Sequence, residues 1–187
     1  LERAGRCRFE EDGQRYLLSS YAVREVLSRY LSVAPGDVCM AITAKGKPYL
    51  KGEGLHFSLS HAKRVAIVAV ARARVGADVE EMSKDYPHME VAERFFVKGE
   101  VEALKAEVDP LKRVALFFSY WTRKEALLKA SGEGLYEDLK DTDFSKAGST
   151  AGFQMDHGGS RWTVAELEPA QGVFCSVALE GDLRSIE

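Results

Sequence analysis

The chain is 187 residues long and 45% hydrophobic, which is enough to bury a sizeable core in one domain or two small, closely packed lobes. Its 29 acidic residues slightly outnumber its 26 lysines and arginines, so the overall charge argues against a bulk binder of nucleic acid or anionic membranes. The three cysteines lie far apart without zinc-ligand spacing, which argues against a disulfide framework or structural zinc and favours a cytoplasmic protein.

The N-terminal part of the chain reads as one helix followed by short strands. Apolar residues first recur at every fourth position, which is typical of an amphipathic helix, and Pro35-Gly36 follow this run. Apolar and polar residues later alternate, as in a strand with one buried face, and this strand ends at Ser60 and His61. The predicted elements are a helix over residues 15–31, strands over 37–42 and 55–60, and a turn over 45–48.

A sheet and a group of helices are predicted for the rest of the chain. Two runs of β-branched and small residues, 65–71 and 74–80, are expected to be central strands of a sheet joined by a tight connection. Helical periodicity then appears three times, with a break at Pro110 and a stop at Gly132 and Gly134. The helices cover residues 89–97, 101–108 and 111–130, and a closing meander of strands lies around residues 144, 153, 162–167 and 173–179.

Two carboxylates share one face of the strand predicted over 74–80. The strand period of two places Asp78 and Glu80 on the same side. Two negative charges there are explained by a cation or a solvent-filled cleft, and Gly76 is expected to leave room for a ligand to approach the backbone. A strand end that simply runs into solvent remains the alternative.

A polar stripe follows the helix predicted over 111–130. Trp121, Glu125 and Lys129 stand four positions apart and therefore line one helical face. An ordinary Glu-Lys pair on a solvated face would give the same pattern. Because apolar residues bury much of this helix, we expect the stripe to face an interior cleft.

Together these residues indicate a site for Mg²⁺ and a phosphate. Three carboxylates from a strand and a helix supply hard oxygen ligands, and a nearby lysine indicates a phosphate anion. Ser60, His61 and Lys47 offer further phosphate donors, although each of these residue types alone more often has a structural role. The sequence has neither a P-loop nor a GxGxxG run, so nucleotide binding of those types is not expected.

Four motifs in order resemble the Sfp-type 4′-phosphopantetheinyl transferases of the holo-acyl-carrier-protein synthase superfamily, and the resemblance covers nearly the whole chain. They are Gly46-Lys47-Pro48, Phe57 to His61, Gly76 to Glu80 and Trp121 to Lys129. The resemblance implies an α+β fold in which two similar αβ halves, roughly residues 1–73 and 74–187, pack as a pseudo-dimer. Its active site would lie in the cleft between them.

The resemblance also implies a role for each matching residue. Asp78, Glu80 and Glu125 would hold Mg²⁺, while Lys129 and His61 would contact the phosphates of coenzyme A. The remaining implied positions are Lys47 near the 3′-phosphate, Ser60 and Arg15 in coenzyme binding, and Glu100 with Glu125 and Lys129 among the catalytic residues. For Glu100, a carboxylate that simply favours a helix N-terminus remains a competing interpretation.

One departure from the family lies at the N-terminus. Family members normally carry a strand and a basic segment before the position that matches Leu1, so a fragment or a shorter form is expected. Arg3, Arg6 and Arg8 would then replace the basic segment only in part.

The implied reaction moves the 4′-phosphopantetheine arm of coenzyme A to a serine of an apo acyl or peptidyl carrier protein, releasing adenosine 3′,5′-bisphosphate. Such carriers serve fatty acid, polyketide or nonribosomal peptide synthesis, and Lys63, Arg64 and Arg123 are expected to form a basic docking surface for an acidic one. Two alternatives remain: a non-catalytic coenzyme A-binding or carrier-docking module, and an Mg²⁺-dependent phosphohydrolase.

Overall fold

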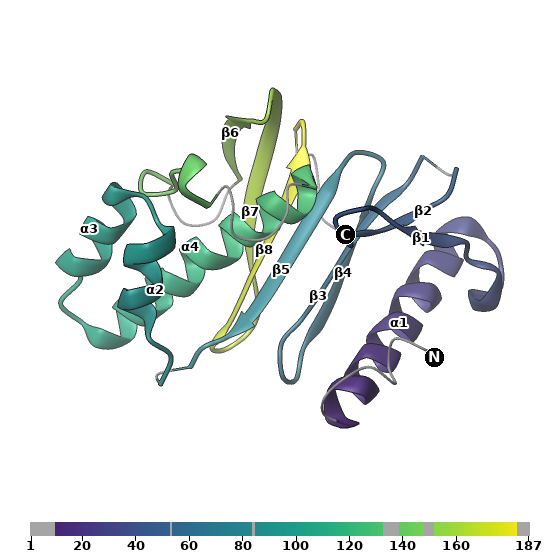
Figure 1. Cartoon of the computed structure of the whole chain (residues 1–187), viewed down its shortest axis with the longest axis horizontal. Coiled ribbons are helices and arrows are strands. Elements are labelled where there is room, and N and C mark those ends of the chain that lie inside the picture. Colours follow the sequence, from purple (N-terminus) through teal and green to yellow (C-terminus); the bar gives the residue numbers. More distant parts are fainter. Residues whose placement is uncertain (1–9, 53, 84, 133–138, 148–151, 183–187) are drawn as a thin grey trace.

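The computed structural model describes residues 10–52, 54–83, 85–132, 139–147 and 152–182, with the backbone alone for residues 10–16. Its elements form two parts that lie side by side (Figure 1). The N-terminal part consists of α1 (Glu10–Leu31), the 3-10 turn η2 (Pro35–Asp37), β1 (Met40–Ile42), β2 (Pro48–Leu50), β3 (His56–His61) and β4 (Ala66–Ala71). The C-terminal part consists of β5 (Val75–Glu81), α2 (His88–Phe95), α3 (Lys98–Ala106), α4 (Pro110–Ser131), the 3-10 turn η3 (Leu139–Asp141), β6 (Phe153–His157), β7 (Ser160–Ala170) and β8 (Val173–Glu180).

Apolar contacts between α1 and two hairpins form the core of the N-terminal part. Leu27 of α1 is fully buried in a cluster with Leu50 and Phe57. Burying one such side chain stabilises the fold by about 1.5–3 kcal/mol. Arg24, also on α1, donates a hydrogen bond to the carbonyl of Val38 at 2.7 Å and so ties the chain that follows the helix back onto it.

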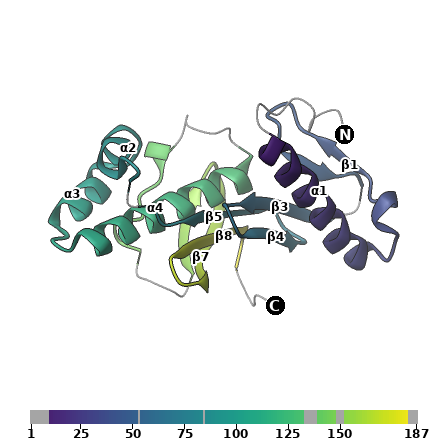
Figure 2. The same cartoon turned by 90° about the horizontal axis from the view of Figure 1, so that it is seen from below.

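The C-terminal part is an antiparallel sheet in the order β5-β8-β7-β6, with α4 packed against one face (Figure 2). Phe117 of α4 and Trp162 of β7 belong to one buried core. The helix begins where the Asp109 carboxylate accepts a hydrogen bond from the Leu111 amide at 2.8 Å, and it ends at Gly132, whose φ is 79°. A well-capped, buried helix is thereby fixed on the sheet.

The contact between α4 and β5 depends on Gly76. A Cβ atom at this position would lie 2.0 Å from the carbonyl oxygen of Ala126 and 2.3 Å from the amide nitrogen of Ala130. Only glycine therefore permits the helix backbone to lie this close to the strand. The expectation that Gly76 leaves room for a ligand is wrong, because the backbone of α4 takes that space.

The two parts meet where β3 lies along β5. The hydroxyl of Ser58 accepts a hydrogen bond from the amide of Ala77 at 3.0 Å, and that of Ser60 accepts one from the amide of Val79 at 3.3 Å. Side-chain oxygens thus replace a neighbouring strand at this edge of β5, which pairs only with β8 among the described strands. The prediction that residues 65–71 and 74–80 form central strands of one sheet is wrong. β4 pairs with β3 and is only half-buried, whereas β5 pairs with β8, packs against α4 and is largely buried.

Most other predicted elements are confirmed within a few residues. The strand expected over residues 37–42 is shorter, since Asp37 belongs to η2 and β1 begins at Met40. Phe144, expected near a strand, is fully buried in an irregular segment, and Gly134 lies outside the described residues. The mixed α+β class is confirmed, whereas the similarity of the two halves to each other stays a prediction. Among the described helices, none has both the length and the apolar character needed to cross a membrane.

Candidate active site

Side chains from β3, β5 and α4 converge between the two parts of the chain. Lys129 of α4 lies 2.5 Å from Asp78 of β5, measured from Nζ to Oδ1. Ser60 of β3 donates to the same carboxylate oxygen at 2.9 Å and accepts from Lys129 at 3.1 Å. The Asp78 side chain is only 5% exposed and that of Lys129 is 29% exposed, so the carboxylate is largely desolvated while the lysine still reaches the cavity.

Glu80 and Glu125 lie close enough to Asp78 for its negative charge to raise their pKa values. We call Asp78, Glu80 and Glu125 the carboxylate cluster. Burial, followed by repulsion from Asp78, raises the pKa of Glu80 to about 7 and that of Glu125 also to about 7. Lys129 opposes both shifts, and the indole of Trp121 also opposes the shift of Glu80 by a hydrogen bond. The structure therefore brings together the predicted acidic residues and the predicted helical stripe.

The carboxylate cluster is incomplete as a hydrogen-bonded unit. Oδ2 of Asp78 and Oε1 of Glu125 are buried, and neither has a hydrogen-bond partner among the described residues. Leaving a buried polar atom unpaired costs about 1–3 kcal/mol, so these oxygens favour an additional positive group.

A hard cation shared with a substrate fits these acids better than a metal held by protein alone. Within the described ranges, no three His, Cys, Asp or Glu side chains are grouped so that they would hold a metal ion. Mg²⁺ usually binds through one or two carboxylates plus waters and substrate phosphates. The two unpaired oxygens of Asp78 and Glu125 match that requirement.

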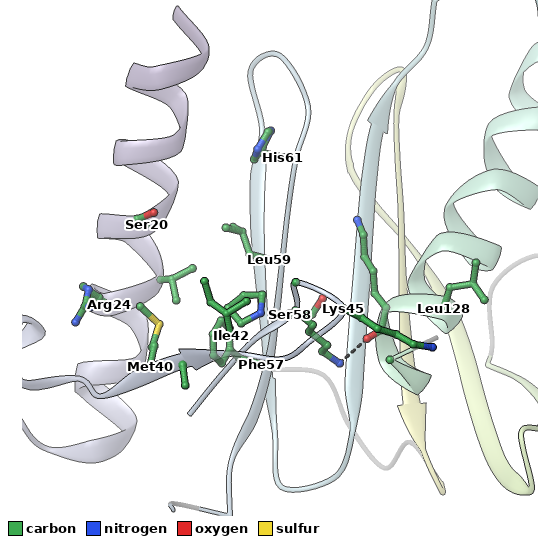
Figure 3. Close-up of a pocket in the computed structure, with 17 residues that line it drawn as sticks. Ser20, Arg24, Met40, Ile42, Lys45, Phe57, Ser58, Leu59, His61 and Leu128 are labelled. Atoms are coloured by element: carbon green, nitrogen blue, oxygen red, sulfur yellow. Dashed lines mark hydrogen bonds between the residues drawn. The ribbon is translucent and has the colours of Figure 1, made fainter. Parts of the chain in front are cut away.

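A cavity of about 560 Å³ opens beside this cluster, between α1, the turn from β1 to β2, β3 and the end of α4 (Figure 3). Lys129 lines it and also contacts Asp78, so it connects the cavity to the carboxylate cluster. His61 lies at the far end of β3 with an exposed side chain. Apolar and basic side chains both line the cavity. The apolar ones include Met40, Ile42, Phe57 and Leu59, and the basic ones are Arg24, Lys45, Lys47, His61 and Lys129.

Lys47 and Lys45, both in the turn between β1 and β2, differ in what they contact. The ammonium of Lys47 donates to the backbone carbonyls of Val75 at 3.3 Å and Ala130 at 3.4 Å, and also to that of Lys129. Lys45 lines the same cavity with an exposed side chain, and the sequence interpretation did not select it. Its position in a turn of two lysines was the available signal, but nothing in the sequence distinguished the two side chains.

Glu100 lies elsewhere, in the packing of α3 against α4. Its carboxylate is fully buried, 2.9 Å from the fully buried ammonium of Lys124, and accepts from the amides of Phe144 at 2.9 Å and Val97 at 3.2 Å. Lys124 and Glu125 are neighbours on α4, so their side chains leave the helix about 100° apart. This geometry favours the helix N-terminal role for Glu100, close to the competing interpretation of the sequence.

Two other predicted basic residues have different outcomes. The side chain of Arg15, like Arg3, Arg6 and Arg8, lies outside the described residues. Arg123, expected on an exposed docking surface, has a side chain only 6% exposed and 2.8 Å from Glu166. That expectation is wrong, because Arg123 lies on the side of α4 that packs against the sheet, where Glu166 of β7 pairs with it.

Comparison with known proteins decides the family. Residues 74–178 match the family model described as the 4′-phosphopantetheinyl transferase superfamily, and residues 1–73 match the one described as 4′-phosphopantetheinyl transferase, N-terminal. The chain belongs to the 4′-phosphopantetheinyl transferase superfamily. The Sfp-type resemblance of the four motifs is thereby confirmed.

Curated transferases of this superfamily align with most of the chain. The 4′-phosphopantetheinyl transferase HetI of Nostoc sp. is 33% identical over 97% of this chain and 77% of its own length. The 4′-phosphopantetheinyl transferase Sfp of Bacillus subtilis is 33% identical over 72% of this chain, which spans 60% of that transferase. The solved holo-[acyl-carrier-protein] synthase of Thermotoga maritima is 18% identical, with a TM-score of 0.37 over 58% of this chain and 62% of its own, which is too low to bear on the fold.

Proposed function

We propose that this chain transfers the 4′-phosphopantetheine arm of coenzyme A to a serine hydroxyl of an apo acyl or peptidyl carrier protein and releases adenosine 3′,5′-bisphosphate. Membership of the superfamily supports the reaction. The carboxylate cluster supports the position that we propose for the active site. Asp78 and Glu125 have unpaired buried oxygens, and Lys129 connects the cluster to a basic cavity.

The reaction divides into binding, charge stabilisation and proton transfer. The serine oxygen forms a bond to the β-phosphorus of coenzyme A as the bond from that phosphorus to the adenosine bisphosphate breaks. Lys129, at the boundary of cavity and cluster, is placed to stabilise negative charge that grows on the phosphoryl oxygens. Asp78 and Glu125, with Glu80 beside them, would hold Mg²⁺ together with the substrate phosphates, and the bound ion would supply positive charge that polarises the pyrophosphate.

The proton of the serine hydroxyl needs an acceptor near neutral pH. In the metal-free protein, burial raises the pKa of Glu125 to about 7, and a bound cation would lower it again. We favour Glu125 as the acceptor because it lies one turn before Lys129 on the same face of α4. Glu100 is better supported as a structural residue, since both of its oxygens accept hydrogen bonds inside the fold.

A mass-spectrometric assay with an apo carrier protein, coenzyme A and Mg²⁺ tests the proposal. The wild type should add one phosphopantetheine group to the carrier, while Asp78→Asn and Glu125→Gln should lose at least about 100-fold in rate, as expected for loss of charge stabilisation in the transition state. Glu168→Gln, an exposed carboxylate of β7, is the matched control and should keep full activity.

Other results would identify the alternatives. Turnover of coenzyme A without any carrier would indicate a phosphohydrolase. Binding of coenzyme A with no transfer to any carrier would indicate a non-catalytic module. Near-normal transfer by Asp78→Asn and Glu125→Gln would remove the carboxylate cluster from the reaction.

A further inference from the structure

The last turn of α4 has backbone carbonyls that the helix itself leaves without partners. The final carbonyl groups of any α-helix lack intrahelical donors. Here the amide of Gly132 takes the carbonyl of Leu128 at 3.0 Å, and no amide within the described residues takes those of Lys129 and Ala130. Both accept hydrogen bonds from the ammonium of Lys47, and the dashed line in Figure 3 marks the one to Lys129.

The ammonium of Lys47 is directed at backbone groups. An ammonium has three donors, and Lys47 faces three carbonyls, two at the end of α4 and one at Val75 of β5. Its positive charge also lies at the negative end of the helix dipole, which is favourable. Burial and the charge of Arg74 lower the pKa of Lys47, which is consistent with an ammonium directed into the protein.

The turn that carries Lys47 is itself held by hydrogen bonds. The amide of Lys47 donates to the hydroxyl of Thr43 at 3.0 Å, and the amide of Thr43 donates to the carbonyl of Lys47 at 2.9 Å. Gly46 has a φ of 87°, which a glycine adopts without strain. The turn therefore presents Lys47 to α4 from a defined position rather than from a freely moving loop.

Resting on the transferase function proposed above, we infer that Lys47 is a positioning residue, which joins the turn between β1 and β2 to α4 and so holds Lys129 at Asp78. Lys129 takes part at both ends of this chain of contacts. Its carbonyl accepts from Lys47, and its ammonium pairs with Asp78. Loss of the Lys47 contact therefore displaces the turn of helix from which the Lys129 side chain extends.

The same contact sets the separation of the cavity walls. The turn between β1 and β2 forms one side of the cavity, and the end of α4 forms the other. Misplacing a reacting group by about 1 Å costs on the order of 100-fold in rate. We therefore expect Lys47 to act on turnover through Lys129 more than on the affinity for coenzyme A.

Steady-state kinetics of Lys47→Met, Lys47→Arg and Lys45→Met, at saturating carrier, separate positioning from phosphate binding. Lys47→Met should lower kcat roughly 10- to 100-fold and change KM for coenzyme A less than about threefold. Lys47→Arg should recover part of kcat, because a guanidinium also donates to carbonyls. Lys45→Met, which removes an equal charge from the cavity, should raise KM more than it lowers kcat.

Coenzyme A without its 3′-phosphate distinguishes a direct contact. If Lys47 bound that phosphate, Lys47→Met would raise KM for coenzyme A and abolish the preference of the wild type for coenzyme A over 3′-dephospho-coenzyme A. That result would overturn the inference. The inference expects the preference to be the same in Lys47→Met and in the wild type.

Hydrogen exchange tests the contact without any activity. Amides in the last turn of α4 should exchange faster in Lys47→Met than in the wild type, and should be unchanged in Lys45→Met. Equal exchange in Lys47→Met and wild type would overturn the inference, and Lys47→Gln replaces Lys47→Met if the latter does not fold. A wild type that transfers nothing would reject the proposed function, while hydrogen exchange would still decide whether Lys47 holds α4.

Discussion

Replacing Glu125 by glutamine should stabilise the metal-free protein, and the gain should grow with pH. Burial and neighbouring acids raise the pKa of Glu125 from 4.5 to about 7. The folded chain therefore holds this proton more tightly than the unfolded chain, so stability is fully present below about pH 4.5 and decreases as pH rises through 7. Such a shift lowers the free energy of unfolding by about 3 kcal/mol at pH 8 and by less than about 1 kcal/mol at pH 5.

The difference between Glu125→Gln and the wild type should consequently widen by about 2 kcal/mol from pH 5 to pH 8. We set this slightly below the arithmetic value because the repulsion from Asp78 and Glu80 is shared among three acids. Urea unfolding in the presence of a chelator, measured at several pH values, gives the two stability curves. Glu168→Gln on the exposed side of β7 should run parallel to the wild type. Parallel curves for Glu125→Gln as well would refute the reasoning that its carboxylate is repelled and desolvated in the fold.

Two further substitutions test the packing that supports the site. Gly76→Ala should destabilise the protein by about 3 kcal/mol or more, because the added Cβ would lie 2.0 Å from the carbonyl oxygen of Ala126; a melting temperature close to that of the wild type would contradict this. Lys124→Met should cost about 3–5 kcal/mol in the free energy of unfolding, because it leaves the Glu100 carboxylate buried without its cation. Adding Glu100→Gln to Lys124→Met should recover part of that loss, and a double variant no more stable than the single one would count against the buried pair.

Local pattern was sufficient to predict much of the secondary structure. The helix that carries Glu125 and Lys129 was predicted close to its observed bounds, because helical periodicity and the terminal Gly132 are both local signals. The alternation that placed Asp78 and Glu80 on one face is likewise a property of any strand. We also inferred that these two acids approach the polar stripe of the helix. The structure confirms this, because Asp78 and Lys129 shift the pKa values of Glu80 and Glu125.

Local sequence pattern did not predict contacts between residues that are far apart in the chain. Nothing near Lys47 in the sequence indicates that its ammonium meets carbonyls more than 80 positions later. Arginine is usually a surface residue, yet the side chain of Arg123 is only 6% exposed and pairs with Glu166 on β7. Glu100 matched an active-site position, but Lys124 and the amide of Phe144 hold its carboxylate inside the fold.

By itself, the sequence determined the residues available for chemistry and the local elements on which they lie. Four motifs specified the family, and the strand and helix periods specified which side chains share a face. Only the tertiary structure decided which of these groups face one another, how far each is removed from water, and which are already used by the backbone. Those properties depend on the approach of α4 to β5 and of the turn between β1 and β2 to α4. Such contacts arise from packing between segments far apart in the chain, where hydrophobic burial and hydrogen-bond satisfaction act together and no local pattern records the outcome.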